Sequence, residues 1–269
     1  QDRLDAHLAS DPSPALRPLV PDAGGLLPRT VYDQFRTRTG RLITLSGPDV
    51  LTLPRTCRDV LLSPVKGHRL WLVDYSSAEP RLVLGLQGKA VEGDLYPAVG
   101  RAASLSADIP RARLKLATTG ALYGASPETV ARVLSVGLRQ AVKFCQHVDT
   151  FFGSGRLRQQ LEAEYRAHGF VRNLYGKRVT PDNSSVHSPG QLLNNFTQSS
   201  MAIGALLGFA AGSAVTAPGT VPLFVIHDAC VVSSGPEGPR EFVQAARRVP
   251  GMATDMALSV GLLGGDRDD

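Results

Sequence analysis

Two aspartates stand where apolar segments of the sequence break. Asp74 ends the run Leu70–Val73, which is short and rich in branched and aromatic residues, as buried strands are. Asp228 stands between two further apolar runs, a pattern that predicts a β-hairpin with an acid at its tip. Because Mg²⁺ prefers carboxylate oxygens, water and substrate phosphates, the pair predicts a site for two Mg²⁺ ions, with Mn²⁺ as a substitute.

Each aspartate taken alone has an ordinary explanation. An Asp at a strand end commonly caps the following helix, and an Asp at a hairpin tip is commonly a turn former. The pair His227-Asp228 is less ordinary, because a charge enclosed by apolar strands is costly unless it is paired or binds a metal. Two carboxylate-bound ions can clamp the attacking and leaving oxygens of an in-line phosphoryl displacement, which is the chemistry these residues would serve.

A third segment places polar side chains at helical spacing. Arg111, Lys115, Thr119 and Tyr123 recur every four residues and therefore lie along one face of a predicted helix. Two cations, a small polar group and an aromatic ring in that order could hold a nucleotide, with the cations on its phosphates. The alternative is an amphipathic helix with a solvated basic stripe.

These segments, in this order, resemble the motifs of the family A DNA polymerases, the bacterial polymerase I and T7-like phage group. DYSSAEPR, beginning at Asp74, resembles that family's first palm motif DYSxxExR, and VIHD resembles its last palm motif VHDE. RARLKLATTGALYG resembles its fingers-helix motif RxxxKxxxFGxxYG. Shorter matches are TGRL at residues 39–42 and NNFTQ, which resembles NxxxQG.

The resemblance implies a role for each matching residue. Asp74 and Asp228 would bind the metal ions and, with Lys115, carry the catalysis. The residues that would bind the nucleotide are Arg111, Lys115, Thr119, Tyr123, Glu79 and Tyr75. The residues that would contact primer–template DNA are Arg41, Asn194, Gln198 and His227.

The implied function is a template-directed DNA polymerase that adds deoxynucleotides (dNTPs) to a primer 3′-end. Three positions depart from the family pattern: Thr119 replaces an aromatic residue, Ala229 replaces a Glu, and Tyr96 stands where a His is usual. They leave open a catalytically weak or inactive relative that binds DNA or a partner. A second alternative is an RNA- or primer-synthesising polymerase, against which Glu79 argues, because a Glu there resembles a block to the ribose 2′-hydroxyl.

The fold class expected from the resemblance is α+β, with a palm-type antiparallel sheet and a mostly helical fingers subdomain. We expect an N-terminal surface segment at 1–38, palm at 39–93, fingers at 94–186 and palm again at 187–269. The short N-terminal segment predicts a reduced or absent thumb and no proofreading domain, so a protein partner that supplies grip on DNA is a further expectation.

Composition agrees with an ordinary soluble globular protein, and the resemblance implies a cytoplasmic enzyme that is bacterial or phage-encoded. The 269 residues carry a net charge of +5, dominated by Arg, which suits phosphate binding. Cys57, Cys145 and Cys230 lack metal-ligand spacing and are expected to be free thiols. The apolar stretch 201–215 is shorter than the roughly 20 residues a membrane span needs, so a buried helix and no membrane partner are expected.

Overall fold

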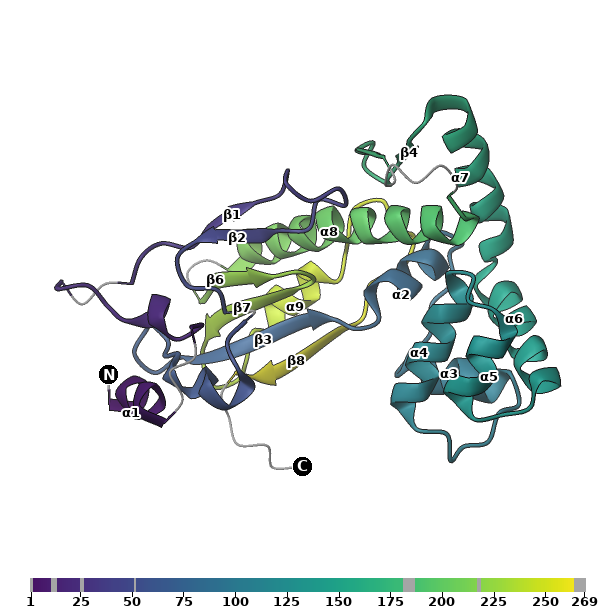
Figure 1. The fold of residues 1–269 in the computed structure, drawn as a ribbon. Helices are drawn as coiled ribbons and strands as arrows, with labels where there is room; N and C mark the ends of the chain where they lie inside the picture. Colours follow the sequence, from purple (N-terminus) through teal and green to yellow (C-terminus); the bar gives the residue numbers. More distant parts are fainter. Residues whose placement is uncertain are drawn as a thin grey trace. The chain divides into compact units, whose positions relative to one another are not determined.

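The computed structural model describes residues 2–10, 14–24, 27–50, 52–180, 187–216 and 219–263 (Figure 1). The chain forms two compact units. The sheet unit takes its described residues from Gln1–Ser76, Ala202–Pro250 and Ala257–Asp269. The helical unit consists of Ser77–Met201 and Gly251–Met256. These divisions do not test the four segments predicted from the resemblance, which remain a prediction.

A four-stranded antiparallel sheet organises the sheet unit, in the order β6-β7-β3-β8 (Figure 1). The strands are β3 (Arg69–Tyr75), β6 (Thr220–Ile226), β7 (Ala229–Ser234) and β8 (Leu258–Leu262). Strand β6 lies at an edge and accommodates Pro222, where the register of its pairing with β7 shifts. The predicted strand before Asp74 and the predicted hairpin around Asp228 are therefore both present.

Helix packing buries one face of this sheet. The second half of α8 (Pro189–Thr216) passes so close that a Cβ on Gly208 would lie 2.0 Å from the Tyr75 hydroxyl oxygen. The ring of Phe209 lies 5.2 Å from the Tyr75 ring and 6.2 Å from the ring of Phe242 on α9 (Arg240–Ala246). Small residues in α8 thus let the helix approach the sheet closely.

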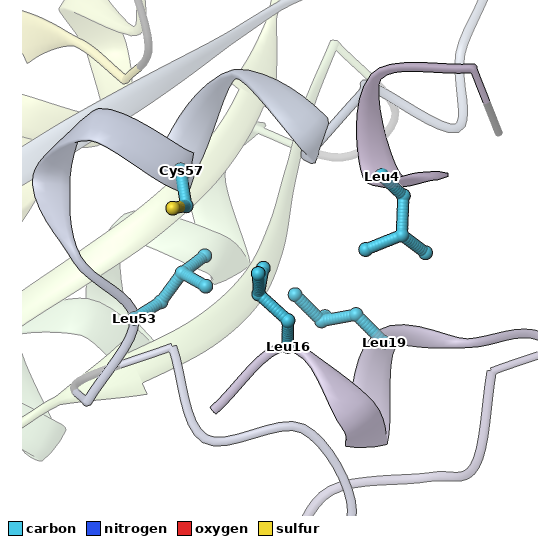
Figure 2. Packing of buried hydrophobic residues seen from close by; sticks show 5 residues of the cluster. All are labelled: Leu4, Leu16, Leu19, Leu53 and Cys57. Carbon is cyan, nitrogen blue, oxygen red and sulfur yellow. The ribbon is translucent and has the colours of Figure 1, made fainter. Parts of the chain in front are cut away.

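The N-terminal residues form a small core of their own. Leu4, Leu16, Leu19, Leu53 and Cys57 are buried together where α1 (Asp2–Ser10) and the 3-10 turn η1 (Arg17–Leu19) meet η2 (Arg55–Val60) (Figure 2). The sequence predicted only a surface segment here. The leucines explain the difference, because their burial offsets the entropy cost of ordering a Pro-rich segment. A two-stranded hairpin, β1 (Val31–Asp33) with β2 (Ile43–Ser46), follows.

The helical unit begins with α2 (Ala78–Gly85) and α3 (Leu95–Ala102), and α4 (Arg111–Leu122) packs on α3. Helices α5 (Pro127–Leu134) and α6 (Leu138–Phe152) pack on α4, and α7 (Ser154–His168) packs on α6. Two of these helices begin at residue types that commonly cap helix N-termini. Asp94 accepts a hydrogen bond from the Tyr96 amide at the start of α3, and Ser126 accepts one from the Thr129 amide at the start of α5.

A short hairpin follows α7, with β4 (Val171–Arg172) and β5 (Arg178–Val179). Buried Asn173 fastens it to the first half of α8, donating from Nδ2 to the Ser199 carbonyl at 3.1 Å and to Ser199 Oγ at 3.0 Å. The Leu174 amide donates to Ser200 Oγ at 3.1 Å. The polar residues in the first half of α8 therefore hold the hairpin. In the second half of α8, Gly208 packs on the sheet.

Helix α8 is long and apolar enough to cross a membrane by length and composition, and half of its most apolar stretch is buried inside the protein. The helix expected over residues 201–215 is therefore the second half of a longer helix. The contacts of Gly208, and of Gly212 with Phe242, show that its small residues serve packing within the protein. The cysteines are free thiols, as predicted.

Candidate functional site

The structure brings the two predicted metal-binding aspartates to the same end of the sheet. Asp74 on β3 pairs with Ala229, the first residue of β7, and Asp228 immediately precedes that residue. The Tyr75 amide donates to the Asp228 carbonyl oxygen at 3.1 Å, which fixes the two backbone segments against each other. Both aspartates are partly exposed, so their carboxylates can be reached from solvent.

A tight turn carries Asp228. His227 and Asp228 are the two residues between β6 and β7, and Ile226 pairs with Ala229 across them. His227 has a φ of 54°, in the left-handed region that non-glycine residues seldom adopt. The strand pairing on either side of the turn holds this strained conformation, and the His227 side chain is exposed beside the partly exposed acid.

The two carboxylates suit a hard divalent cation that also takes ligands from substrate and water. In the part of the chain that the structure describes, no group of three or more His, Cys, Asp or Glu side chains could hold a metal ion by itself. Mg²⁺ sites of nucleotide-processing enzymes commonly use one or two carboxylates and complete their shell with phosphates and water. A two-carboxylate donor set therefore fits Mg²⁺, and Mn²⁺ accepts the same oxygen ligands.

Helix α4 presents the predicted nucleotide-binding residues within the helical unit. Arg111 and Lys115 are exposed, whereas Thr119 and Tyr123 are partly buried. The Tyr123 hydroxyl lies 2.9 Å from Oγ1 of Thr197 on α8, so the ring is held in place at the end of the helix. The face therefore changes from exposed cations to a fixed aromatic ring along its length.

Arg111 already has an acidic neighbour in the structure. Its Nε donates to the Asp94 carboxylate, and its guanidinium carbon lies 5.4 Å from the centre of the Tyr96 ring. The hydrogen bond to Asp94 raises the pKa of Arg111 above its ordinary value. The spacing from Asp94 to Arg111 in the sequence is no signal of this pair. A phosphate would have to compete with Asp94 for the guanidinium.

Glu79 lies in the first turn of α2 and is partly buried. Two residues on, buried Arg81 donates to the Val91 carbonyl at 2.5 Å and also to the Gly93 carbonyl. Burial lowers the pKa of Arg81, while the charges of Asp94 and Tyr96 act in the opposite direction. Arg81 thus ties the Glu79 turn to the segment that leads into α3, a positioning role that the motif match did not reveal.

The predicted DNA-binding residues fall into two groups. Asn194 and Gln198 lie one turn apart on α8, and Gln198 Nε2 donates to Asn194 Oδ1 at 3.0 Å. Arg41 lies just before β2 in the sheet unit, where its carbonyl accepts a hydrogen bond from Thr37 Oγ1 at 2.7 Å. The roles of these residues and of His227 stay predictions.

Tyr75 points away from the aspartates. Its side chain is 1% exposed, and its hydroxyl donates to the Ala246 carbonyl oxygen at 2.5 Å. Successive residues of a strand project to opposite faces, so Tyr75 faces α8 and α9 while Asp74 faces the other side. This packing does not support the prediction that Tyr75 binds the nucleotide, and the alternation of the strand was a signal that could have shown it.

The sheet unit thus holds Asp74, Asp228, His227, Tyr75 and Arg41. The helical unit holds the other predicted residues, which are Glu79, Arg111, Lys115, Thr119, Tyr123, Asn194 and Gln198. Their assembly into one site stays a prediction.

Comparison with known proteins finds similarity to two DNA polymerases. A DNA polymerase of Mycobacterium phage D29 is 27% identical over 174 residues, which cover 59% of this chain and 28% of the phage protein. A DNA polymerase of Mycobacterium phage L5 is 26% identical over 182 residues, covering 64% of this chain and 29% of that protein. The matches therefore span less than a third of the relatives, and no known protein-family model matches the sequence.

The fold comparison covers almost the whole chain. The POL domain of Pol1 from M. smegmatis, solved in complex with DNA primer-template and dNTP, superposes with a TM-score of 0.73. It covers 97% of this chain and 50% of that one at 20% identity, so the likeness concerns the fold. The predicted resemblance to DNA polymerases and the predicted α+β polymerase-type fold are both confirmed.

Proposed function

We propose that the chain is a DNA-directed DNA polymerase, or the polymerase part of one, which adds dNTPs to a primer 3′-end by two-metal-ion nucleotidyl transfer. The observation that carries this proposal is the meeting of Asp74 and Asp228 at one end of the sheet, through the pairing of Asp74 with Ala229. The phage relatives are named DNA polymerases, and the Pol1 structure contains primer-template and dNTP. Both ligands are therefore the proposed partners of this chain.

Asp74 and Asp228 would hold the metal ions. When bound, such ions lower the pKa of an attacking hydroxyl and neutralise charge on the transferring phosphates. The chain itself supplies carboxylate oxygens on two backbone segments that the hydrogen bond from the Tyr75 amide to the Asp228 carbonyl holds together. Fixed ligands matter because a preorganised site loses no free energy to reorganisation at the moment of reaction.

The exposed cations of α4 would hold the triphosphate. Lys115 is a point charge with three donors, and Arg111 offers a planar fork that matches two phosphate oxygens. Exchange of the Arg111 hydrogen bond from Asp94 to a phosphate would link nucleotide binding to the start of α3. Tyr123, held by Thr197, would give the sugar or base a rigid wall.

Primer extension with the variants Asp74→Asn and Asp228→Asn tests the proposal. Each substitution removes a negative charge while keeping the side-chain size, so we expect loss of Mg²⁺-dependent extension and retention of DNA binding. Asp255→Asn is the matched control, because Asp255 is an exposed aspartate of the helical unit. Extension by either site variant at the rate of the control would refute the two-metal assignment.

A DNA-binding protein without polymerase activity is the second candidate. Ala229, where the resembling motif has Glu, is buried and pairs with both Asp74 and Ile226, so one possible metal ligand is lacking beside the two aspartates. This candidate predicts that the unaltered chain binds primer–template DNA but extends no primer with Mg²⁺ or Mn²⁺. Parallel reactions with ribonucleotides separate the remaining alternative, an RNA- or primer-synthesising enzyme.

A further inference from the structure

The loop between β1 and β2 exposes an aromatic ring. Phe35 is 90% exposed, the highest value among the large apolar side chains that the structure describes. Burial of a phenyl ring stabilises a folded protein by about 1.5–3 kcal/mol relative to its exposure. The exposed ring of Phe35 therefore does not add this stabilisation to the fold. A single exposed apolar side chain is common on protein surfaces, so the function of this ring must be inferred from the charges beside it.

Hydrogen bonds fix the loop that carries this ring. We call residues 34–42 the Phe35 loop. Asp33 Oδ1 accepts hydrogen bonds from the Phe35 amide at 2.6 Å and from the Arg36 amide at 3.3 Å. The Gly40 amide donates to the Thr37 carbonyl at 3.1 Å, and Thr37 Oγ1 donates to the Arg41 carbonyl at 2.7 Å. The ring is therefore held outward by its own backbone.

The charge of the Phe35 loop identifies the chemistry of the partner. Its sequence, QFRTRTGRL, contains three Arg residues and no acid. Arg36 lies 3.4 Å from Asp33 through Nε, yet its side chain stays 69% exposed, and Arg38 at the centre of the loop adds a second cation. An aromatic face beside cations matches a nucleobase attached to phosphates. A lipid surface would call for several apolar side chains, and the loop offers one exposed ring.

The strand before the loop is related to the strand that leads to Asp228. Burial raises the pKa of Tyr32 on β1, and the backbone of Val225 on β6, three residues before Asp228, acts on that pKa in the opposite direction. Phe35 is three residues beyond Tyr32, a distance of at most about 11 Å along an extended chain. Both residues belong to the sheet unit, which also contains the hairpin that carries the aspartate.

We propose that Phe35 stacks on a nucleobase of bound DNA while Arg36 and Arg38 bind the adjoining phosphates. This inference rests on the proposed function in one respect, that the chain holds primer–template DNA. It adds a base-stacking interaction that the sequence motifs did not contain. Because a stacked ring accepts any base, the interaction would contribute grip on DNA without sequence preference.

DNA binding tests the inference in EDTA, where catalysis does not enter. Fluorescence anisotropy with labelled primer–template DNA compares Phe35→Ala, Phe35→Tyr and Phe35→Leu. Loss of a stacked base weakens binding about fivefold or more, so we expect that effect from Phe35→Ala and a large part of it from Phe35→Leu. Phe35→Tyr keeps an aromatic face and should bind like the unaltered chain. Leu62→Ala is the matched control, since Leu62 is a 76% exposed apolar residue of the same unit.

Two further measurements locate the stacked base and the phosphates. 2-Aminopurine placed at successive DNA positions should change its fluorescence at one position, and Phe35→Ala should abolish that change. Arg36→Gln should make the slope of log K against log salt shallower by about 0.9 for each phosphate that the arginine neutralises.

Several results would overturn the inference. Equal affinities of Phe35→Ala and Leu62→Ala, or full affinity in Phe35→Leu, would exclude base stacking. Reduced binding to anionic vesicles with unchanged DNA binding would assign the loop to a membrane surface. If the unaltered chain binds DNA but extends no primer, the polymerase proposal fails, and the affinities of the Phe35 variants still test base stacking. If the unaltered chain binds no DNA, the polymerase proposal and the stacking proposal both fail.

Discussion

Replacement of Tyr75 by Phe separates a packing role from the nucleotide-binding role that the sequence predicted. The substitution keeps the ring against Phe209 and removes only the hydroxyl that donates to the Ala246 carbonyl. That carbonyl would be left without this donor at a buried position, which costs about 1–3 kcal/mol. For a chain of this size the melting temperature should fall by about 2–4 °C for each kcal/mol.

A second substitution at the same place sharpens the test. A methyl group on Gly208 would lie 2.0 Å from the Tyr75 hydroxyl and 2.7 Å from the Ala246 carbonyl oxygen, so Gly208→Ala forces the helix away from the sheet. Such overpacking costs about 1–3 kcal/mol. The double variant should lose less stability than the two single losses together, because the clash with the hydroxyl disappears. Gly235→Ala, with open space around its added Cβ, is the control.

Denaturant unfolding of the four variants and steady-state primer extension provide the measurements. We expect Tyr75→Phe to lower the free energy of unfolding while leaving the KM for dNTP unchanged. The reverse pattern, unchanged stability with a raised KM, would show that Tyr75 contacts the nucleotide and that our interpretation of the packing is wrong.

The other predictions concern α4 and the β4–β5 hairpin. Lys115→Ala should reduce kcat/KM for dNTP by about 10²–10³ if this lysine stabilises the developing phosphate charge, and Lys143→Ala, an exposed lysine on α6, should not. An unchanged kcat/KM in Lys115→Ala would show that this helix does not hold the triphosphate. Burial raises the pKa of Tyr175 from 10.0 to about 12, so between these pH values the folded chain keeps a proton that the unfolded chain releases. The free energy of unfolding should therefore fall as the pH rises through that window. In Tyr175→Phe the denaturant midpoint should fall less over the same pH range. Identical pH profiles of the variant and the unaltered chain would show that Tyr175 does not cause the fall.

Local chemistry allowed much of the fold to be predicted from the sequence. The starts of α3 and α5 follow from Asp94 and Ser126, whose side chains accept amide hydrogen bonds within the next turn. The ends of α4 and α6 lie within two residues of Gly124 and Gly153, both of which have positive φ. The hairpin around Asp228 follows from two apolar runs separated by a polar pair.

Other features depend on neighbours that lie far away in the chain. The N-terminal core needs Leu53, just before η2, and Cys57, within η2, to cover the leucines at 4, 16 and 19, and the Pro-rich composition gave no sign of these contacts. The Arg111 hydrogen bond to Asp94 joins two helix starts, and neither residue signals the other in the sequence. Side-chain pairs of this kind depend on how helices pack, which residue spacing does not encode.

The sequence by itself determined which residues carry the chemistry: two acids at the ends of apolar runs, and two cations and an aromatic ring at helical spacing. Only the tertiary structure decided that Asp74 pairs with the residue after Asp228, because that requires the register of β3 against β7. It also decided that Tyr75 belongs to the core, because α8 covers the face of the sheet opposite Asp74. The physical reason is the same in both cases. Residue type fixes what a side chain can do, and long-range packing fixes what it meets.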